Sequence, residues 1–165
     1  MSAAKYQGSV RSLVKKLKYK PYAIKAYEEI DLILRRYFTE PEQLFPNNAI
    51  LIPIPLHPKK LQKRGFNQAE FVAQTLSSIW KLPIQKDLLQ RTRQGVDQTS
   101  LSRKERIKNV HGLYRINPQT EESLRGKRFI LVDDVTTTGA TLKKCARLLK
   151  QNGANKVWGA TFARD

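Results

Sequence analysis

Residues 129–142 read Phe-Ile-Leu-Val-Asp-Asp-Val-Thr-Thr-Thr-Gly-Ala-Thr-Leu, and this stretch decides the fold of the chain. Its first four residues are apolar, which is typical of a short buried strand. Two acids and a loop of Thr and Gly follow, and a helical pattern then runs from about residue 140 to residue 151. Open α/β sheets bind ligands where a strand ends and leads into a helix. The stretch therefore predicts a ligand site on an α/β sheet.

The loop has the chemistry of a phosphate cradle. Backbone N–H groups at the start of a helix lack partners within the helix and lie at the positive end of its dipole. Gly139 allows the backbone to approach a phosphate closely, and the threonines add hydroxyl donors. The predicted cradle consists of Thr136, Thr137, Thr138, Gly139, Ala140 and Thr141. The alternative is a structural turn that binds no ligand.

Asp133 and Asp134 lie between the strand and the cradle. Two carboxylates would repel a phosphate, so we expect them to face another part of the ligand. A sugar diol or a hydrated Mg²⁺ ion suits such a pair, because both interact well with carboxylate oxygens. Read alone, a pair of acids also fits a solvated loop end.

Hydrophobic patterns predict further elements on both sides of this stretch. Helices are expected within residues 1–20, ended by Pro21, and over 23–37 and 67–79, the last with Asn67 as its N-cap. Strands are expected at 49–54, 127–132 and 157–162, with a weaker one at 82–89. Strands that alternate with helices indicate a mostly parallel sheet covered on both faces. We expect one domain over 1–165, with a helical segment or hood at 1–48 and an α/β core at 49–165.

The composition narrows the class of protein. No apolar run approaches the ~20 residues that cross a bilayer, so no membrane insertion is expected. The amino end lacks the apolar core of a secretory signal, which makes the cytoplasm the expected location. Cys145 is the single cysteine, so the chain forms no internal disulfide and no cysteine-based zinc site. Its place on the helix after the cradle favours a buried structural thiol.

The charge is strongly basic, with 31 Lys and Arg against 14 Asp and Glu and a formal net charge of +17. Such an excess favours polyanionic partners, either nucleic acid or a multiply phosphorylated small molecule. A merely solvated basic surface is the alternative.

Three basic segments are candidates for anion contacts. In 52–68, Lys63 and Arg64 precede a helix and are placed to stabilise a pyrophosphate leaving group. The polar segment 91–109 has few apolar anchors and is a candidate flap over a diphosphate. Its candidate arginines are Arg91, Arg93, Arg103 and Arg106. Either segment also fits an exposed loop, and 91–109 fits a nucleic-acid contact.

The third segment is the lysine-rich amino-terminal helix, in which Tyr6, Tyr19 and Tyr22 are interleaved with lysines. Aromatic rings among cations are one arrangement that holds single-stranded nucleic acid, by base stacking and charge. Ordinary packing of the three rings against the helices is the alternative.

From Val132 to Thr141 the chain resembles the signature of the type I phosphoribosyltransferases. In that family the paired acids bind the ribose hydroxyls of phosphoribosyl pyrophosphate, and the loop binds its 5′-phosphate. Further motifs resemble the ComF competence proteins, a branch of that family. These motifs are Leu17-Lys18-Tyr19, Ile52-Pro53-Ile54-Pro55-Leu56-His57, Arg64-Gly65-Phe66-Asn67-Gln68, and Arg91 through Gln98-Thr99 to Arg106 and Asn109.

The resemblance implies a Rossmann-like, mostly parallel sheet flanked by helices, with a small hood, a phosphoribosyl pyrophosphate site and Mg²⁺. It implies a role in DNA uptake, near single-stranded DNA and other DNA-uptake proteins. Taken with the basic segments, it assigns catalysis to Asp133, Asp134 and Arg64, with Mg²⁺ held by the two acids through water or ribose hydroxyls. Lys63, Arg91, Arg106 and the cradle are then the substrate contacts.

Three functions stay open on the sequence: a transferase, a DNA-handling protein that has lost the transfer reaction, and a regulatory sensor of phosphoribosyl pyrophosphate. No residue identifies an acceptor base. Typical ComF members begin with a four-cysteine zinc module, which the one cysteine of this chain cannot form. Functions that depend on that module are therefore not expected of these residues.

Overall fold

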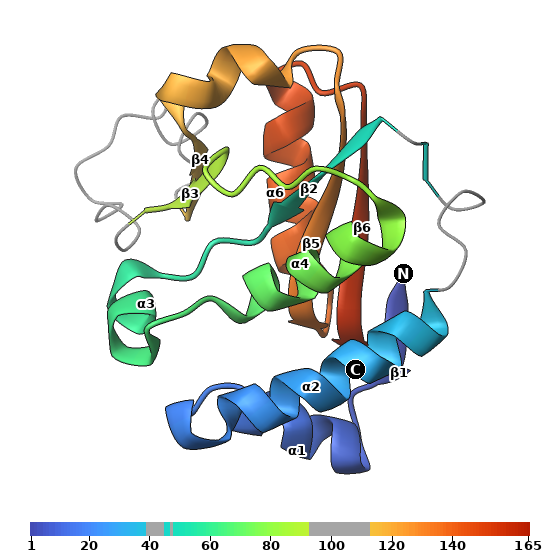
Figure 1. Ribbon diagram of the computed structural model, residues 1–165. Helices are drawn as coiled ribbons and strands as arrows, with labels where there is room; N and C mark the ends of the chain where they lie inside the picture. Colours follow the sequence, from blue (N-terminus) through green and yellow to red (C-terminus); the bar gives the residue numbers. More distant parts are fainter. Residues whose placement is uncertain (39–44, 47, 93–112) are drawn as a thin grey trace.

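The structure is a computed structural model, and it describes residues 1–38, 45, 46, 48–92 and 113–165. Its centre is a four-stranded sheet in the order β1-β6-β5-β2, and every neighbouring pair is parallel (Figure 1). The predicted mostly parallel sheet flanked by helices is confirmed. The strands are β1 (Ser2–Lys5), β2 (Ala49–Pro53), β5 (Arg128–Thr136) and β6 (Lys156–Arg164).

Strand β5 lies inside the sheet and is buried on both faces, which explains its unbroken apolar run. Side chains alternate along it, so Ile130 and Val132 pack into one hydrophobic cluster while Phe129 and Leu131 pack into a second. A strand of this kind requires helices above and below it.

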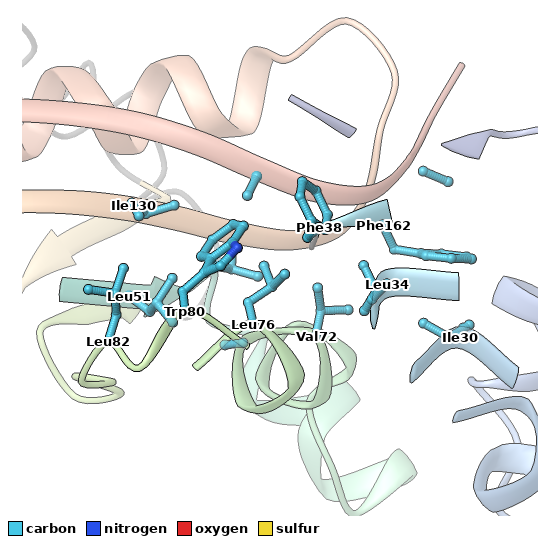
Figure 2. Packing of buried hydrophobic residues seen from close by; sticks show 14 of the residues in the cluster. Ile30, Leu34, Phe38, Leu51, Val72, Leu76, Trp80, Leu82, Ile130 and Phe162 are labelled. Atoms are coloured by element: carbon cyan, nitrogen blue, oxygen red, sulfur yellow. The ribbon is translucent and has the colours of Figure 1, made fainter. Parts of the chain in front are cut away.

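The first face is covered by α1 (Gly8–Lys16), α2 (Lys20–Tyr37) and α4 (Gln68–Trp80). Figure 2 shows Leu76 and Trp80 of α4 gathered with Phe38 and Leu34 against the strand residues Ile130 and Phe162. The rings of Phe38 and Trp80 meet edge to face at 5.2 Å between centroids, an arrangement that aromatic pairs favour. This cluster fixes α2 against the sheet, with α1 packed on α2.

The second face is covered by α6 (Ala140–Gln151), where Cys145 and Leu149 are buried. Beside α6 lies a two-stranded antiparallel ribbon of β3 (Leu89–Arg91) and β4 (Tyr114–Ile116), followed by the 3₁₀ helix η1 (Pro118–Leu124). Figure 1 shows this ribbon and α6 as neighbours. The buried thiol expected on the helix after the cradle is thus confirmed.

Several elements differ from the sequence prediction. The short strand β1 was not predicted, and it extends the sheet beyond β6. The expected strand at 82–89 is reduced to a single bridge between Ile84 and Leu51, and β3 begins only at Leu89. Pro21 was expected to end a helix, but it lies in the first turn of α2, where its missing N–H is no loss. Among the described residues no helix is long and apolar enough to cross a membrane.

Candidate functional site

The acid pair lies where the sheet loses a strand. Strand β2 ends at Pro53, opposite Val132, and the last bond between the two strands runs from Ile54 N to Val132 O at 2.8 Å. Strand β5 continues beyond that level, paired with β6 alone, through Asp133 and Asp134 to Thr136. The side of β5 that faces β2 is therefore free of a strand partner at the two acids.

Two side chains stop the β2–β5 ladder at this level. In a parallel ladder the next bond would run from Asp134 N to Ile54 O. Instead, Asp134 N donates to Asp133 Oδ1 at 2.9 Å, and Ile54 O accepts from Asn67 Nδ2 at 3.0 Å. Both backbone groups are satisfied, so the two strands part here without an unpaired buried polar group. We call this parting of β5 from the end of β2 the crevice. The chain leaves β5 toward α6 on one face of the sheet and leaves β2 toward α4 on the other face. Ligands of open α/β sheets bind between two strands whose connections diverge in this way.

The predicted cradle follows directly on the strand. Gly139 is the N-cap of α6 at φ +72°, a left-handed conformation that favours glycine. Thr138 Oγ1 accepts from Ala140 N at 3.3 Å, and the first turn of α6 carries no acidic side chain. The cradle thus combines hydroxyls with a helix whose first turn carries no acid, an arrangement that suits a phosphate.

The acid pair has an unusual electrostatic setting. Burial raises the pKa of Asp133 well above its usual range, and the adjacent charge of Asp134 raises that pKa further. Asp134 accepts from Val135 N at 2.9 Å, in the same manner as Asp133 accepts from Asp134. Each carboxylate therefore has one oxygen engaged by the backbone of β5, and the interaction between the two acidic side chains also raises the pKa of Asp133.

Arg91, the first residue of the predicted flap, lies in the ribbon near Asp133, whereas residues 93–109 of that segment lie outside the described part of the chain. Its guanidinium carbon lies 5.6 Å from the centre of the Tyr114 ring, and its charge opposes the rise in the pKa of Asp133. The Nε atom of Arg91 is buried and has no hydrogen-bond partner in the described part of the chain. A buried donor of this kind has unused capacity for an anionic ligand.

Tyr114 is a site neighbour that the sequence did not single out. It is buried and packs beside Arg91 in the ribbon register, and its hydroxyl hydrogen-bonds the side chain of Thr141. Burial raises the pKa of Tyr114. Only the fold brings this three-residue strand against the first turn of α6, so no local pattern marked it.

The Arg64 to Gln68 motif forms a joint between elements. Arg64 Nη1 donates to Gln68 Oε1 at 3.1 Å, and Gln68 Nε2 donates to the backbone oxygen of Leu17 at 3.4 Å. The helix α3 (Pro58–Arg64) therefore connects through Gln68 to the end of α1. Arg64 was predicted to be catalytic, and in the structure its guanidinium makes the hydrogen bond to Gln68 that joins these elements. Lys63 is exposed on α3, whereas Arg106 lies outside the described residues.

A cavity of about 370 Å³ lies behind the cradle, between α6 and the edge of the sheet. Thr136 to Gly139, Lys143 and Arg164 border it, whereas Asp133 and Asp134 do not. The cradle therefore borders a cavity on the α6 side of the sheet, and the acids lie outside that cavity.

Comparisons with known proteins agree with this geometry. A model of the phosphoribosyl transferase domain matches residues 61–165, which contain the acid pair and the cradle. Competence protein F of Haemophilus influenzae is 34% identical over 115 residues, 68% of this chain and 50% of that protein. Competence protein ComFC of Bacillus subtilis is 32% identical over 125 residues, 74% of this chain and 48% of its own length. The chain thus spans about half the length of these relatives.

A solved structure titled as the allosteric regulatory enzyme of purine biosynthesis superposes with a TM-score of 0.53. At 18% identity, over 82% of this chain and 25% of that one, it supports the fold alone. With the domain match over most of the chain and relatives of the competence type, the expected resemblance is confirmed. The chain belongs to the phosphoribosyl transferase domain family, in the group of the ComF-like proteins.

Proposed function

We propose that this chain binds phosphoribosyl pyrophosphate in the crevice between β5 and β2. The observation that carries the proposal is the position of Asp133 and Asp134. They lie on β5 beyond the end of β2, and the loop after them leads into α6, whose first turn carries no acid. The carboxylate oxygens of this pair would accept from the ribose 2′- and 3′-hydroxyls. The cradle from Thr136 to Thr141 would hold the 5′-phosphate through backbone N–H groups and hydroxyls.

Cations around the crevice would neutralise the pyrophosphate. The buried Nε of Arg91, which has no partner among the described residues, and the exposed Lys63 would supply positive charge from β3 and α3. Arg64 would hold α3 in place through Gln68 and add its charge. Electrostatic stabilisation of this kind is usually the largest contribution to breaking a bond to a charged leaving group.

The residues present fit Mg²⁺ held jointly with the ligand. Among the described residues no group of three or more acids, histidines or cysteines could hold a metal without further ligands. Mg²⁺ prefers oxygen ligands and is commonly bound by one or two carboxylates together with substrate phosphates, which the acid pair and a diphosphate would provide. When bound, the ion would neutralise charge on the diphosphate.

If transfer takes place, the bond from ribose C1 to pyrophosphate breaks and a nucleophile on an acceptor forms a new bond to C1. Asp133 and Asp134 would orient the ribose, and holding both reactants in place would supply much of the rate. The acceptor is left unassigned. The names of the relatives suggest a setting in natural competence, together with other DNA-uptake proteins, for this chain as well.

The proposal is tested by titrating phosphoribosyl pyrophosphate into the protein by calorimetry, with and without Mg²⁺. Replacing both acids, Asp133→Asn with Asp134→Asn, keeps the side-chain shape and should weaken binding by at least about tenfold, since each lost charge-assisted bond contributes on the order of 1.5–3 kcal/mol. The control Asp87→Asn removes an exposed acid outside the crevice and should bind as the parent does. Unchanged affinity in the double variant would show that the acids do not hold the ligand.

A further inference from the structure

The cavity behind the cradle has apolar walls that the core leaves partly exposed. Leu142 and Ala146 of α6 form one wall, Val157 and Gly159 of β6 form the other, and Leu131 of β5 adds to the lining. Leu131 is fully buried, whereas the other four keep part of their surface exposed. The volume of about 370 Å³ lies within the range of about 300–1,000 Å³ that is usual for small-molecule sites.

The packing on this face explains why the space stays open. Gly159 faces α6, because a methyl group at this position would lie 3.3 Å from Leu142 Cδ1, so β6 presents backbone and no side chain there. The ribbon covers the side of the face near β2, where Tyr114 and Ile52 share one cluster. Apolar surface that stays wet in a hollow is unfavourable, and a ligand that covers it gains hydrophobic free energy.

The end of the cavity next to the cradle is cationic. Arg164 is the register partner of Thr136, and Lys143 Cε lies 3.9 Å from the Cβ position of Gly139. Both cations border the cavity together with the threonines of the cradle. In the described part of the chain no acidic residue borders it, and the ion pairs there join other groups. The two cations therefore have no acidic partner and are available to an anion.

We propose that this cavity binds a small amphipathic anion, a molecule with one carboxylate or phosphate group on a compact apolar body such as fused aromatic rings. The anionic group would pair with Lys143 and Arg164, and the apolar body would lie between α6 and β6. Inorganic phosphate would leave the apolar walls uncovered. A neutral apolar molecule would leave the two cations unpaired, and a metal cation would meet no acidic ligand.

The inference goes beyond the proposed function and does not rest on it. Asp133 and Asp134 lie outside the cavity, and the test contains no phosphoribosyl pyrophosphate. The cradle is the wall that the two sites share. The double variant Asp133→Asn with Asp134→Asn should bind the probes at least as tightly as the parent does, because the loss of two negative charges does not weaken the binding of an anion.

The experiment titrates naphthyl probes into the whole ¹⁵N-labelled chain and follows the amide shifts by NMR. Naphthylacetate and naphthyl phosphate carry the two anionic groups on the same ring system, and naphthylethanol is the neutral analogue. We expect saturable shifts at Leu142, Ala146, Val157 and Gly159 with at least one anionic probe. The neutral analogue should bind at least about tenfold more weakly, since hydrogen bonds to charged groups are the stronger ones.

Adjacent lysines of α6 provide a matched pair of variants. Lys143→Gln should weaken binding of the anionic probe at least about fivefold, because it removes one of the two cations at the cradle end of the cavity. Lys144→Gln removes the next lysine, which is exposed and does not border the cavity, and should leave binding unchanged. Arg164→Gln tests the second cation in the same way, with the exposed Arg147 of α6 changed to Gln as its control.

Ala146→Leu tests the apolar part of the cavity. The larger side chain would occupy space between α6 and β6, so the anionic probe should bind at least about tenfold more weakly. The melting temperature should stay at or above that of the parent, because filling a cavity commonly stabilises a fold. If this variant fails to fold, the lysine and arginine pairs decide the question.

The proposal is overturned if neither anionic probe shifts the four amides, if the neutral analogue binds as tightly as the anions, or if Lys144→Gln weakens binding as much as Lys143→Gln does. Shifts confined to residues 136–141 would also overturn it, because they would place the anion in the cradle alone. Binding of either anionic probe with the expected variant effects supports the proposal, and the tighter probe identifies the preferred anionic group.

Discussion

Asp133 combines a proposed ligand contact with an unfavourable environment. Burial and the neighbouring Asp134 both disfavour its charged form, so its pKa is raised well above the usual range. A carboxyl group of this kind lowers the stability of the folded chain once it ionises. Its retention is expected if the charge is used on a ligand, since binding sites often carry strain that the rest of the fold supports.

The sign of the pH effect follows from that pKa. Between the carboxyl pKa of the unfolded chain, about 3.9, and the higher folded value, the unfolded state releases the proton more readily. The contribution of Asp133 to the free energy of unfolding is therefore lowest at neutral pH, and it rises as the pH falls through the pKa of the folded state. Asp133→Asn should raise the free energy of unfolding by about 0.5–2 kcal/mol at pH 7 and by much less near pH 4. Urea unfolding at several pH values measures this, and an equal effect at both extremes would contradict it.

Tyr114 offers a second single-residue test. Its hydroxyl interacts with the side chain of Thr141 in the cradle. Tyr114→Phe keeps the ring under Arg91 but leaves Thr141 without that partner. We expect a loss of about 1 kcal/mol in the free energy of unfolding and about a fivefold weaker binding of phosphoribosyl pyrophosphate. If binding is unchanged while stability falls, Tyr114 supports only the fold.

These residues differ in how readily the sequence reveals them. The acids and the cradle are contiguous, so one local pattern of strand, acids, loop and helix was enough to predict them. The neighbourhood of Arg91 and Tyr114 depends on a ribbon whose strands are three residues each and are separated by more than twenty residues of chain. Short-range periodicity carries no information about such a pairing.

Among the elements, α4 determines how far the sheet extends toward the site. Its N-cap Asn67 accepts from Ala69 N at 3.2 Å through Oδ1 and donates to Ile54 O through Nδ2. One buried side chain therefore starts a helix and blocks the next rung between β2 and β5. The sequence predicted the cap but gave no sign of the second bond, because the partner lies thirteen residues earlier, just past the end of β2.

Asn67→Ala should remove both effects. The lost cap is worth about 1 kcal/mol, and the unmet buried carbonyl adds a comparable amount, so the free energy of unfolding should fall by about 1–3 kcal/mol. Without the Asn67 side chain, the backbone oxygen of Ile54 would be able to accept from Asp134 N. That bond would extend the pairing of β2 with β5, narrow the crevice and weaken ligand binding. The control is Gln7→Ala, because Gln7 is the N-cap of α1 without a side-chain cap bond. Thermal unfolding measures the stability of both variants, and calorimetry measures their ligand binding. Equal effects of Asn67→Ala and Gln7→Ala would contradict the role proposed for Asn67.

For the molecule as a whole, the net charge of +17 is the dominant electrostatic fact. The ion pairs among the described residues join Arg35 to Asp31 and Lys86 to Glu70, so most cations there face solvent without an acidic partner. Mutual repulsion of like charges destabilises a compact state. The parallel sheet and its two covered faces were predictable from alternating patterns, whereas the contact of α3 with the end of α1 through Gln68 required the fold.

Salt should therefore stabilise the chain. Raising sodium chloride from 20 to 300 mM shortens the Debye length from roughly 20 Å to below 10 Å and screens the repulsion between surface cations. We expect the melting temperature to rise by a few degrees, as measured by differential scanning fluorimetry. A melting temperature that falls with salt would mean that attractive pairs outweigh the repulsion. Phosphate compared with chloride at equal ionic strength separates anion binding from screening.

The buried thiol has a practical consequence. Cys145 is the only cysteine, it is fully buried on α6, and its surroundings raise its pKa to about 12. Maleimides react with the thiolate form of cysteine, and a thiol with such a raised pKa has very little thiolate at neutral pH. A cysteine introduced at an exposed position such as Lys16 or Lys63 would accept a dye or spin label selectively in the otherwise native chain. Distances between α1 and α3 then become measurable in solution without first removing the native sulfur.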